Sequence, residues 1–161
     1  MNKQLTWENQ KQIGDAGEAK IRSLMAARGH EVINLANNPT YWEKDIDMLV
    51  AGHPIEVKTD NVMYRTGNLF IEEGTYFNTG EYHAGWVKYT EAEYLFYLDN
   101  MNEILYIYNM DDVKEKAKHY QIGTLRFPHK RVDGYLMPIG GLPHQTIKLK
   151  EASEWQKVEA S

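Results

Sequence analysis

The sequence predicts an α/β or α+β domain in which helices pack on a mixed central β-sheet. Helical and strand-like patterns alternate along the chain in the order helix, strand, hairpin, strand, helix, strand, helix. The 161 residues are 42% hydrophobic and 12% aromatic, which is enough to build one folded domain without disulfides or a structural metal.

The first half of the chain supplies a helix and three strands. Residues 14–28 carry apolar side chains at helical spacing, with Asp15 placed as an N-cap and Gly29 as a stop signal. Residues 31–35 (EVINL) alternate like a strand, and the following NNPTYWEK is typical of a loop. Residues 44–60 (KDIDMLVAGHPIEVKTD) predict two strands joined by a tight turn.

The second half adds strands around two shorter helices. Residues 67–76 (GNLFIEEGTY) predict a strand, followed by a glycine-punctuated surface loop to about Lys88. TEAE predicts a short helix beginning at Thr90, because it has the spacing of a capping box. A strand over 103–110 and a helix over roughly 112–119, capped by Asp111 or Asp112, come next, and two short strands (GYLMPI and TIKLK) follow.

Composition excludes several classes of function. The chain has no cysteine, so disulfide frameworks and thiolate metal sites are ruled out. The polar N-terminus does not resemble a signal peptide and no apolar run has spanning length, so we expect no membrane role and a cytoplasmic location. The net charge of −5 disfavours bulk attraction to DNA, so nucleic-acid binding would depend on local basic groups or bound cations.

The predicted hairpin concentrates charge on one of its faces. Either Ala51-Gly52 or Gly52-His53 forms the turn, and the first choice places Asp47 opposite Glu56. Both registers separate a charged face from an apolar face, because side chains alternate along a strand. The charged face holds Asp45, Asp47, Glu56 and Lys58, and the apolar face holds Ile46, Met48, Val50, Ile55 and Val57.

Neighbouring carboxylates repel one another unless a cation lies between them. Oxygen ligands without cysteine or paired histidines favour Mg²⁺ or Mn²⁺ over zinc. A nearby lysine can hold a water or stabilise charge on a phosphate, which together with a metal indicates phosphodiester hydrolysis. The alternative is a solvated outer face with cross-strand salt bridges. Glu18 is a further candidate: it shares a helical stripe with Ile21 and Met25, or else it completes a capping box with Asp15.

This pattern resembles the PD-(D/E)XK nuclease superfamily. The residues that carry the resemblance are the helix glutamate Glu18, the aspartate Asp47 and the E-x-K sequence Glu56-Val57-Lys58. The resemblance covers about residues 14–110 and implies a restriction-endonuclease-like αβββαβ core within a single domain of residues 1–161, with 111–161 as a C-terminal extension. Small phage-type members and Holliday-junction resolvases are the most similar in layout.

The resemblance implies that Asp47, Glu56 and the carbonyl of Val57 bind Mg²⁺ or Mn²⁺, with Glu18 in support. Lys58 would position or activate the attacking water. Asp45 competes with Asp47 as the ligand, and we favour Asp47. Asp45, Lys88 and Arg65 are also candidate substrate contacts, although for the two cations a solvated surface position is the more ordinary explanation.

We therefore expect a Mg²⁺-dependent endonuclease that hydrolyses DNA in a bacterial or phage-infected cell. Because resolvases share the core, branched or structured DNA and a homodimer are also expected. The alternative function is a catalytically silent nuclease-like domain that binds nucleic acid or a protein partner.

Overall fold

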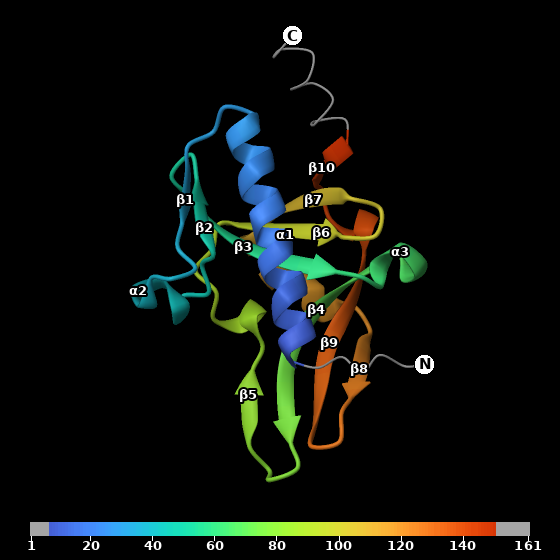
Figure 1. Ribbon diagram of the computed structural model, residues 1–161. Helices are drawn as coiled ribbons and strands as arrows, with labels where there is room; N and C mark the ends of the chain where they lie inside the picture. The colour runs from blue at the N-terminus through green and yellow to red at the C-terminus, as the bar shows by residue number, and fades with distance from the viewer. Residues whose placement is uncertain (1–6, 151–161) are drawn as a thin grey trace.

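Two β-sheets organise residues 7–150, which are the residues that the computed structural model describes (Figure 1). The larger sheet has the strand order β1-β2-β3-β6-β7-β10, in which only β3 and β6 are parallel. Its strands are β1 (Val32–Asn34), β2 (Met48–Val50), β3 (His53–Asp60), β6 (Tyr94–Asp99), β7 (Ile104–Asn109) and β10 (Gln145–Lys148). The smaller, antiparallel sheet has the order β5-β4-β9-β8, formed by β5 (Tyr82–Ala84), β4 (Asn68–Phe77), β9 (Lys130–Pro138) and β8 (Ile122–Arg126).

The helices are few and mostly short. They are α1 (Trp7–Ala27), α2 (Pro39–Trp42), α3 (Met63–Thr66) and α4 (Met110–Lys116), with 3₁₀ turns η1 (Trp86–Lys88), η2 (Ala117–His119) and η3 (Ile139–Gly141). This content confirms the predicted mixed α+β class. Within residues 7–150, no helix is long and apolar enough to cross a membrane.

Helix α1 covers one face of the larger sheet and lies across its central strands (Figure 1). Its apolar stripe, Ile21, Leu24 and Met25, packs against residues of β2, β3 and β6. The approach to β3 is close at Gly17, where a Cβ atom would lie 1.9 Å from Thr59 Oγ1. The packing of α1 therefore fixes the helix against β3 directly beside Glu18.

The second hydrophobic cluster lies on the other face of the larger sheet, where elements of the smaller sheet pack. It includes Leu95 and Tyr97 of β6, Leu69 and Ile71 of β4, and Trp86 of η1. Both faces of the larger sheet are therefore packed. The charged face of the β2–β3 hairpin does not point into open solvent, as the salt-bridge alternative requires, but borders this second core.

The hairpin has the Ala51-Gly52 turn, the first of the two registers considered. Ala51 (φ 49°) and Gly52 (φ 81°) both have left-handed backbone conformations, as a type I′ turn requires. Met48 pairs with Ile55 and Val50 with His53. This pairing puts Asp47 opposite Glu56.

One side chain of the predicted apolar face lies elsewhere. Ile46 packs in the cluster between the sheets, whereas Met48 and Ile55 pack under α1. The reason is that Asp45 has φ 55°, so the backbone before β2 is not extended and the alternation of side chains is interrupted there.

Several expected element boundaries were wrong. Helix α1 begins at Trp7, so Asp15 is an interior residue and not an N-cap. Residues 90–93 are not helical and lead directly into strand β6. The N-cap of α4 is Asn109, whose side chain accepts a hydrogen bond from Asp112 N. The loop expected before Lys88 contains β5, and η1 buries Trp86 and Val87.

Candidate active site

The β2–β3 hairpin brings Asp47 and Glu56 together by main-chain pairing. Asp47 N donates to Ile55 O at 2.9 Å, which continues the ladder one residue beyond β2. The carboxylate of Asp47 turns toward β3 and accepts a hydrogen bond from Val57 N at 2.7 Å. Asp47 is therefore held beside the E-x-K sequence by backbone geometry.

Glu56 and Lys58 form a buried ion pair on β3. Lys58 Nζ lies 2.5 Å from Glu56 Oε1. Glu56 is only 1% exposed, whereas the Lys58 side chain is 31% exposed. The ammonium group also lies 5.1 Å from the centroid of the Trp86 ring, within range of a cation–π interaction. The Lys58 side chain therefore packs against the core but remains partly accessible to solvent.

Asp45 joins this centre through its unusual backbone. Its left-handed conformation turns the chain before β2, and its carbonyl accepts a hydrogen bond from Thr90 Oγ1 at 3.0 Å. Asp45 Oδ2 and Glu56 Oε2 are buried, and no N–H or O–H donor among the described residues reaches either oxygen, although the carboxyl groups of Asp45 and Glu56 are close enough to share a proton in a hydrogen bond. Buried carboxylate oxygens without partners are costly, so the centre has free acceptor capacity.

Glu18 approaches the same centre from α1. Because the helix begins eleven positions earlier, at Trp7, the capping-box interpretation of Glu18 is wrong. Its carboxylate lies 3.9 Å from Arg22 of the next helical turn. Burial, followed by repulsion from Asp47 and Asp15, raises the pKa of Glu18 to about 7.

The other carboxyl groups of the centre are similarly perturbed. Burial raises the pKa of Glu56 well above its ordinary value, and Asp47 and Asp45 add repulsion, while Lys58 opposes the shift. Burial also raises the pKa of Asp45, against the attraction of Lys58. Burial alone would lower the pKa of Lys58, but the charges of Glu56 and Asp45 raise it, so the lysine stays protonated.

The donor chemistry of the centre fits a hard divalent cation. Glu18, Asp45, Asp47 and Glu56 supply only oxygen donors, which Mg²⁺ and Mn²⁺ prefer. Within residues 7–150, however, no three His, Asp or Glu side chains are already arranged as a metal cluster. Asp47 is turned onto Val57 N and Glu56 onto Lys58. The two buried oxygens without partners are the part of the centre that a cation would satisfy.

The two other predicted substrate contacts lie in different surroundings. Lys88 Nζ lies 2.5 Å from both Glu73 Oε1 and Tyr82 Oη, so its charge is held by β4 and β5. Arg65 is on α3, with its guanidinium 5.6 Å from the Tyr64 ring. Their roles in substrate binding remain predictions.

Sequence reasoning missed three residues next to the centre: Trp86, Tyr89 and Thr90. They belong to GWVKYTE, which was interpreted as a loop leading into a helix. The available signal was the continuous apolar and aromatic run YLFYL in residues 94–98, which is typical of a buried strand and competes with the capping-box spacing of TEAE.

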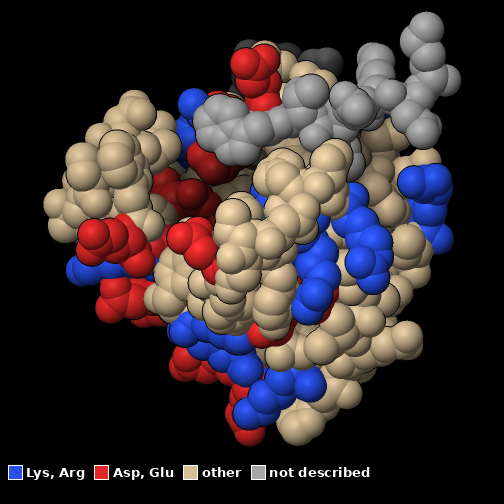
Figure 2. Space-filling model, turned by 90° about the horizontal axis from the view of Figure 1, so that it is seen from below, with Lys and Arg blue, Asp and Glu red and all other residues tan. Residues whose placement is uncertain are grey.

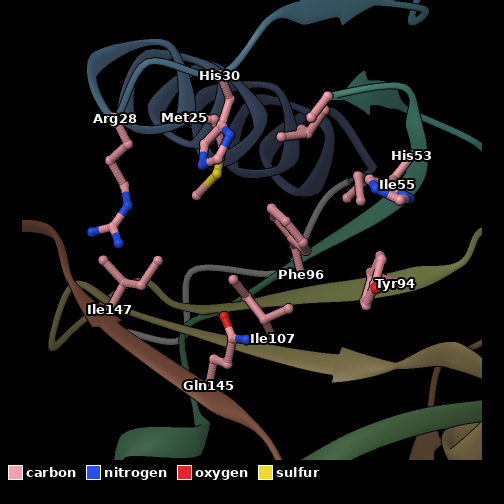
Figure 3. A pocket seen from close by; sticks show the side chains of 12 residues that line it. Met25, Arg28, His30, His53, Ile55, Tyr94, Phe96, Ile107, Gln145 and Ile147 are labelled. Carbon is pink, nitrogen blue, oxygen red and sulfur yellow. The ribbon is translucent and has the colours of Figure 1, made fainter.

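The charge distribution supports a recessed acidic site. Seen from below, the molecule is hollowed between two lobes, and acidic atoms lie deep in this hollow (Figure 2). Lysine and arginine side chains gather toward the right of the same face, the side on which β8 and β9 lie in Figure 1. A separate cavity of about 330 Å³ lies between the C-terminal end of α1 and the larger sheet, lined by Met25, Arg28 and Ile147 among others (Figure 3). No aspartate or glutamate lines that cavity, so it is distinct from the carboxylate centre.

Comparison with solved structures identifies a similar fold. A bacterial homing endonuclease, I-Ssp6803I, superposes with a TM-score of 0.51 over 74% of this chain and 74% of its own, at 12% sequence identity. The chain shares the fold of a nuclease. At this identity the likeness concerns the fold alone. No protein-family model matches the sequence, and no curated protein matches it significantly.

Proposed function

We propose that this protein is a PD-(D/E)XK-type endonuclease that hydrolyses DNA with Mg²⁺ or Mn²⁺. The observation that carries the proposal is the Glu56–Lys58 pair beside Asp47, with a buried carboxylate in Glu56 and two buried carboxylate oxygens that no donor within residues 7–150 reaches. The fold shared with a homing endonuclease supports it independently.

Each residue has a defined part in this proposal. Asp47, Glu56 and the carbonyl of Val57 hold the cation, with Glu18 in support, and Asp45 adds a further carboxylate from the turned loop. When bound, the cation supplies Lewis-acid stabilisation of the phosphate and lowers the pKa of a water. Lys58, protonated and partly exposed, orients the attacking water or stabilises the charge that develops on the phosphate.

The proposed substrate is DNA, which is itself negatively charged, so binding requires a local group of basic side chains on this acidic chain. A chain of charge −5 must gather its cations locally, and the β8–β9 hairpin offers Arg126, Lys130 and Arg131. We also propose that the preferred substrate is branched DNA and that the enzyme is a homodimer. Its place of action in this proposal is the cytoplasm of a bacterial or phage-infected cell.

Cleavage of labelled nucleic acids tests it. The panel contains linear duplex, single strand, flap and four-way-junction DNAs and an RNA, each with Mg²⁺, Mn²⁺ or EDTA. Glu56→Ala and Lys58→Ala should abolish metal-dependent cleavage. The matched controls are Glu103→Ala and Lys20→Ala, which break an exposed pair at 3.9 Å and should leave cleavage unchanged. Undiminished cleavage by folded Lys58→Ala would refute the assignment.

A second candidate function is nucleic-acid binding without catalysis. The observation that favours it is that Glu56 is already paired with Lys58 at 2.5 Å and Asp47 already accepts a hydrogen bond from Val57 N. Part of the negative charge of the centre is therefore balanced without a cation. The same panel discriminates between the two functions. DNA binding that is independent of metal, with no cleavage of any substrate, would support the binding function.

A further inference from the structure

Residues 85–91 (GWVKYTE) cross between the two sheets and form a segment that we call the strap. At its start, Gly85 N donates to Glu73 O at 2.8 Å, and a Cβ atom on Gly85 would lie 2.0 Å from Glu72 O. At its end, Glu91 N donates to Lys44 O at 2.8 Å. The strap is therefore fixed at one end to β4 and at the other to the loop that carries Asp45.

The side chains of the strap also hold the charged centre. Thr90 is 0% exposed, and its hydroxyl donates to Asp45 O, while its own carbonyl accepts a hydrogen bond from Lys114 Nζ. Trp86 is buried, with its ring under the Lys58 ammonium group. The position of the strap relative to Asp45 and Lys58 is thus set by contacts at both of its ends.

Tyr89 is the exception among these residues, because it is exposed. Its side chain is 47% exposed, although Thr90 beside it is buried and Lys88 on its other side is bound to Glu73. Its N–H donates to Trp86 O at 3.2 Å, which fixes its backbone. No residue in the range 7–150 forms a hydrogen bond with its hydroxyl group, although the charges of Asp45 and Lys58 act on it.

An exposed phenol beside a carboxylate centre, with no hydrogen-bond partner in the part of the chain that the structure describes, is suited to donate a hydrogen bond to a bound substrate. Burial, together with the charge of Asp45, raises the pKa of Tyr89, so its O–H stays a donor at neutral pH. A phosphate that approaches several carboxylates is repelled, and a lysine or arginine placed there would pair with the carboxylates instead. A neutral donor avoids that competition, and tyrosine is a common donor to nucleic-acid phosphates.

We propose that Tyr89 is a substrate-contacting residue whose phenol O–H donates to a phosphate oxygen next to the cleaved bond. The proposal rests on the proposed nuclease function and adds a residue to it. The geometry that supports it is the strap, in which Tyr89 is exposed between Trp86, whose ring lies beside the Lys58 ammonium group, and Thr90, whose hydroxyl donates to Asp45 O.

Single-turnover cleavage measures the contact. The substrate is the DNA of the panel that the wild type cleaves fastest, and the enzyme concentration is varied to obtain the half-saturating concentration and the maximal rate. In Tyr89→Phe the half-saturating concentration should rise about tenfold to a hundredfold, the range for a hydrogen bond to a charged group. The logarithm of the half-saturating concentration should depend on the logarithm of the salt concentration with the same slope as in the wild type, because the substitution removes no cation. Tyr64→Phe, which alters a tyrosine of similar exposure (46%) on α3, is the matched control and should behave as wild type.

The outcomes separate this proposal from the function on which it rests. Wild-type values for both Tyr89→Phe and Tyr89→Ala would overturn the contact while the nuclease assignment stands. A loss in Tyr89→Ala alone would assign base stacking by the ring and overturn the phosphate contact. A wild type that neither cleaves nor binds any member of the panel would overturn both proposals.

Discussion

Replacing Lys58 with methionine should destabilise the fold, because it leaves the Glu56 carboxylate alone in the core. Glu56 is 1% exposed, and its Oε1 lies 2.5 Å from Lys58 Nζ while its Oε2 has no described partner. Removing one member of a buried pair costs about 3–5 kcal/mol. Because Lys58 is 31% exposed, we expect the lower end of that range, about 3 kcal/mol at pH 8.

The cost should depend on pH, with a sign that the pKa of Glu56 dictates. Burial already raises that pKa above its ordinary 4.5, and loss of the lysine charge raises it further. The folded variant then keeps a proton that the unfolded chain releases above pH 4.5. Stability therefore falls as the pH rises from 4.5 to the folded pKa, by about 1.4 kcal/mol per pH unit. At pH 5 the variant should be close to wild type.

Urea unfolding followed by circular dichroism at pH 5 and pH 8 measures both effects. The double variant Glu56→Gln/Lys58→Met removes the stranded charge and should recover most of the loss at pH 8. Lys20→Met, which breaks the exposed pair with Glu103, should cost less than about 1 kcal/mol at either pH. A Lys58→Met protein as stable as wild type at pH 8 would refute the buried-pair reasoning.

Three further predictions concern the surroundings of the centre. Glu18→Gln should gain stability relative to wild type between pH 5 and pH 8, since the pKa of Glu18 is raised to about 7 and ionisation there costs the wild type free energy; urea midpoints at both pH values test this. Gly17→Ala should cost about 1–3 kcal/mol through its clash with Thr59, and Gly17→Ala/Thr59→Ala should relieve it, as thermal melts would show. Thr90→Val should cost about 1–3 kcal/mol by leaving Asp45 O unpaired and should also slow cleavage, whereas unchanged unfolding and cleavage would contradict the role of the strap.

The hairpin could be predicted from the sequence because every signal for it is local. Gly52 marks the turn, and the alternation of β3 is enough to put Glu56 and Lys58 on one face and Val57 on the other. Ile46 was misplaced, because the alternation of side chains is interrupted at Asp45, just before it. Nothing in KDID shows that Asp45 has a left-handed backbone, and the hydroxyl that donates to its carbonyl belongs to Thr90, forty-five positions later.

The strap and the second sheet could not be predicted, since their interactions are not local. Strand β4 was recognised, but its pairing with β9 joins Asn68 to Pro138, a separation for which a single sequence carries no signal. TEAE has the spacing of a capping box, yet residues 94–99 complete the larger sheet beside β3. Burial in a central strand outweighed a helix-start signal worth about 1 kcal/mol.

Charge balance connects the fold of this centre to its proposed chemistry. Glu18, Asp45, Asp47 and Glu56 bring four carboxyl groups into one centre, and the two cations that act on them, Lys58 and Arg22, can offset two negative charges. Burial first, and then repulsion between the carboxylates, raises the pKa values of Glu18, Asp45 and Glu56, so that protons can supply the missing positive charge. A divalent cation can supply it equally well, and it would then replace the protons at neutral pH. The arrangement that is unfavourable for folding at neutral pH is therefore the same arrangement that would make a cation bind.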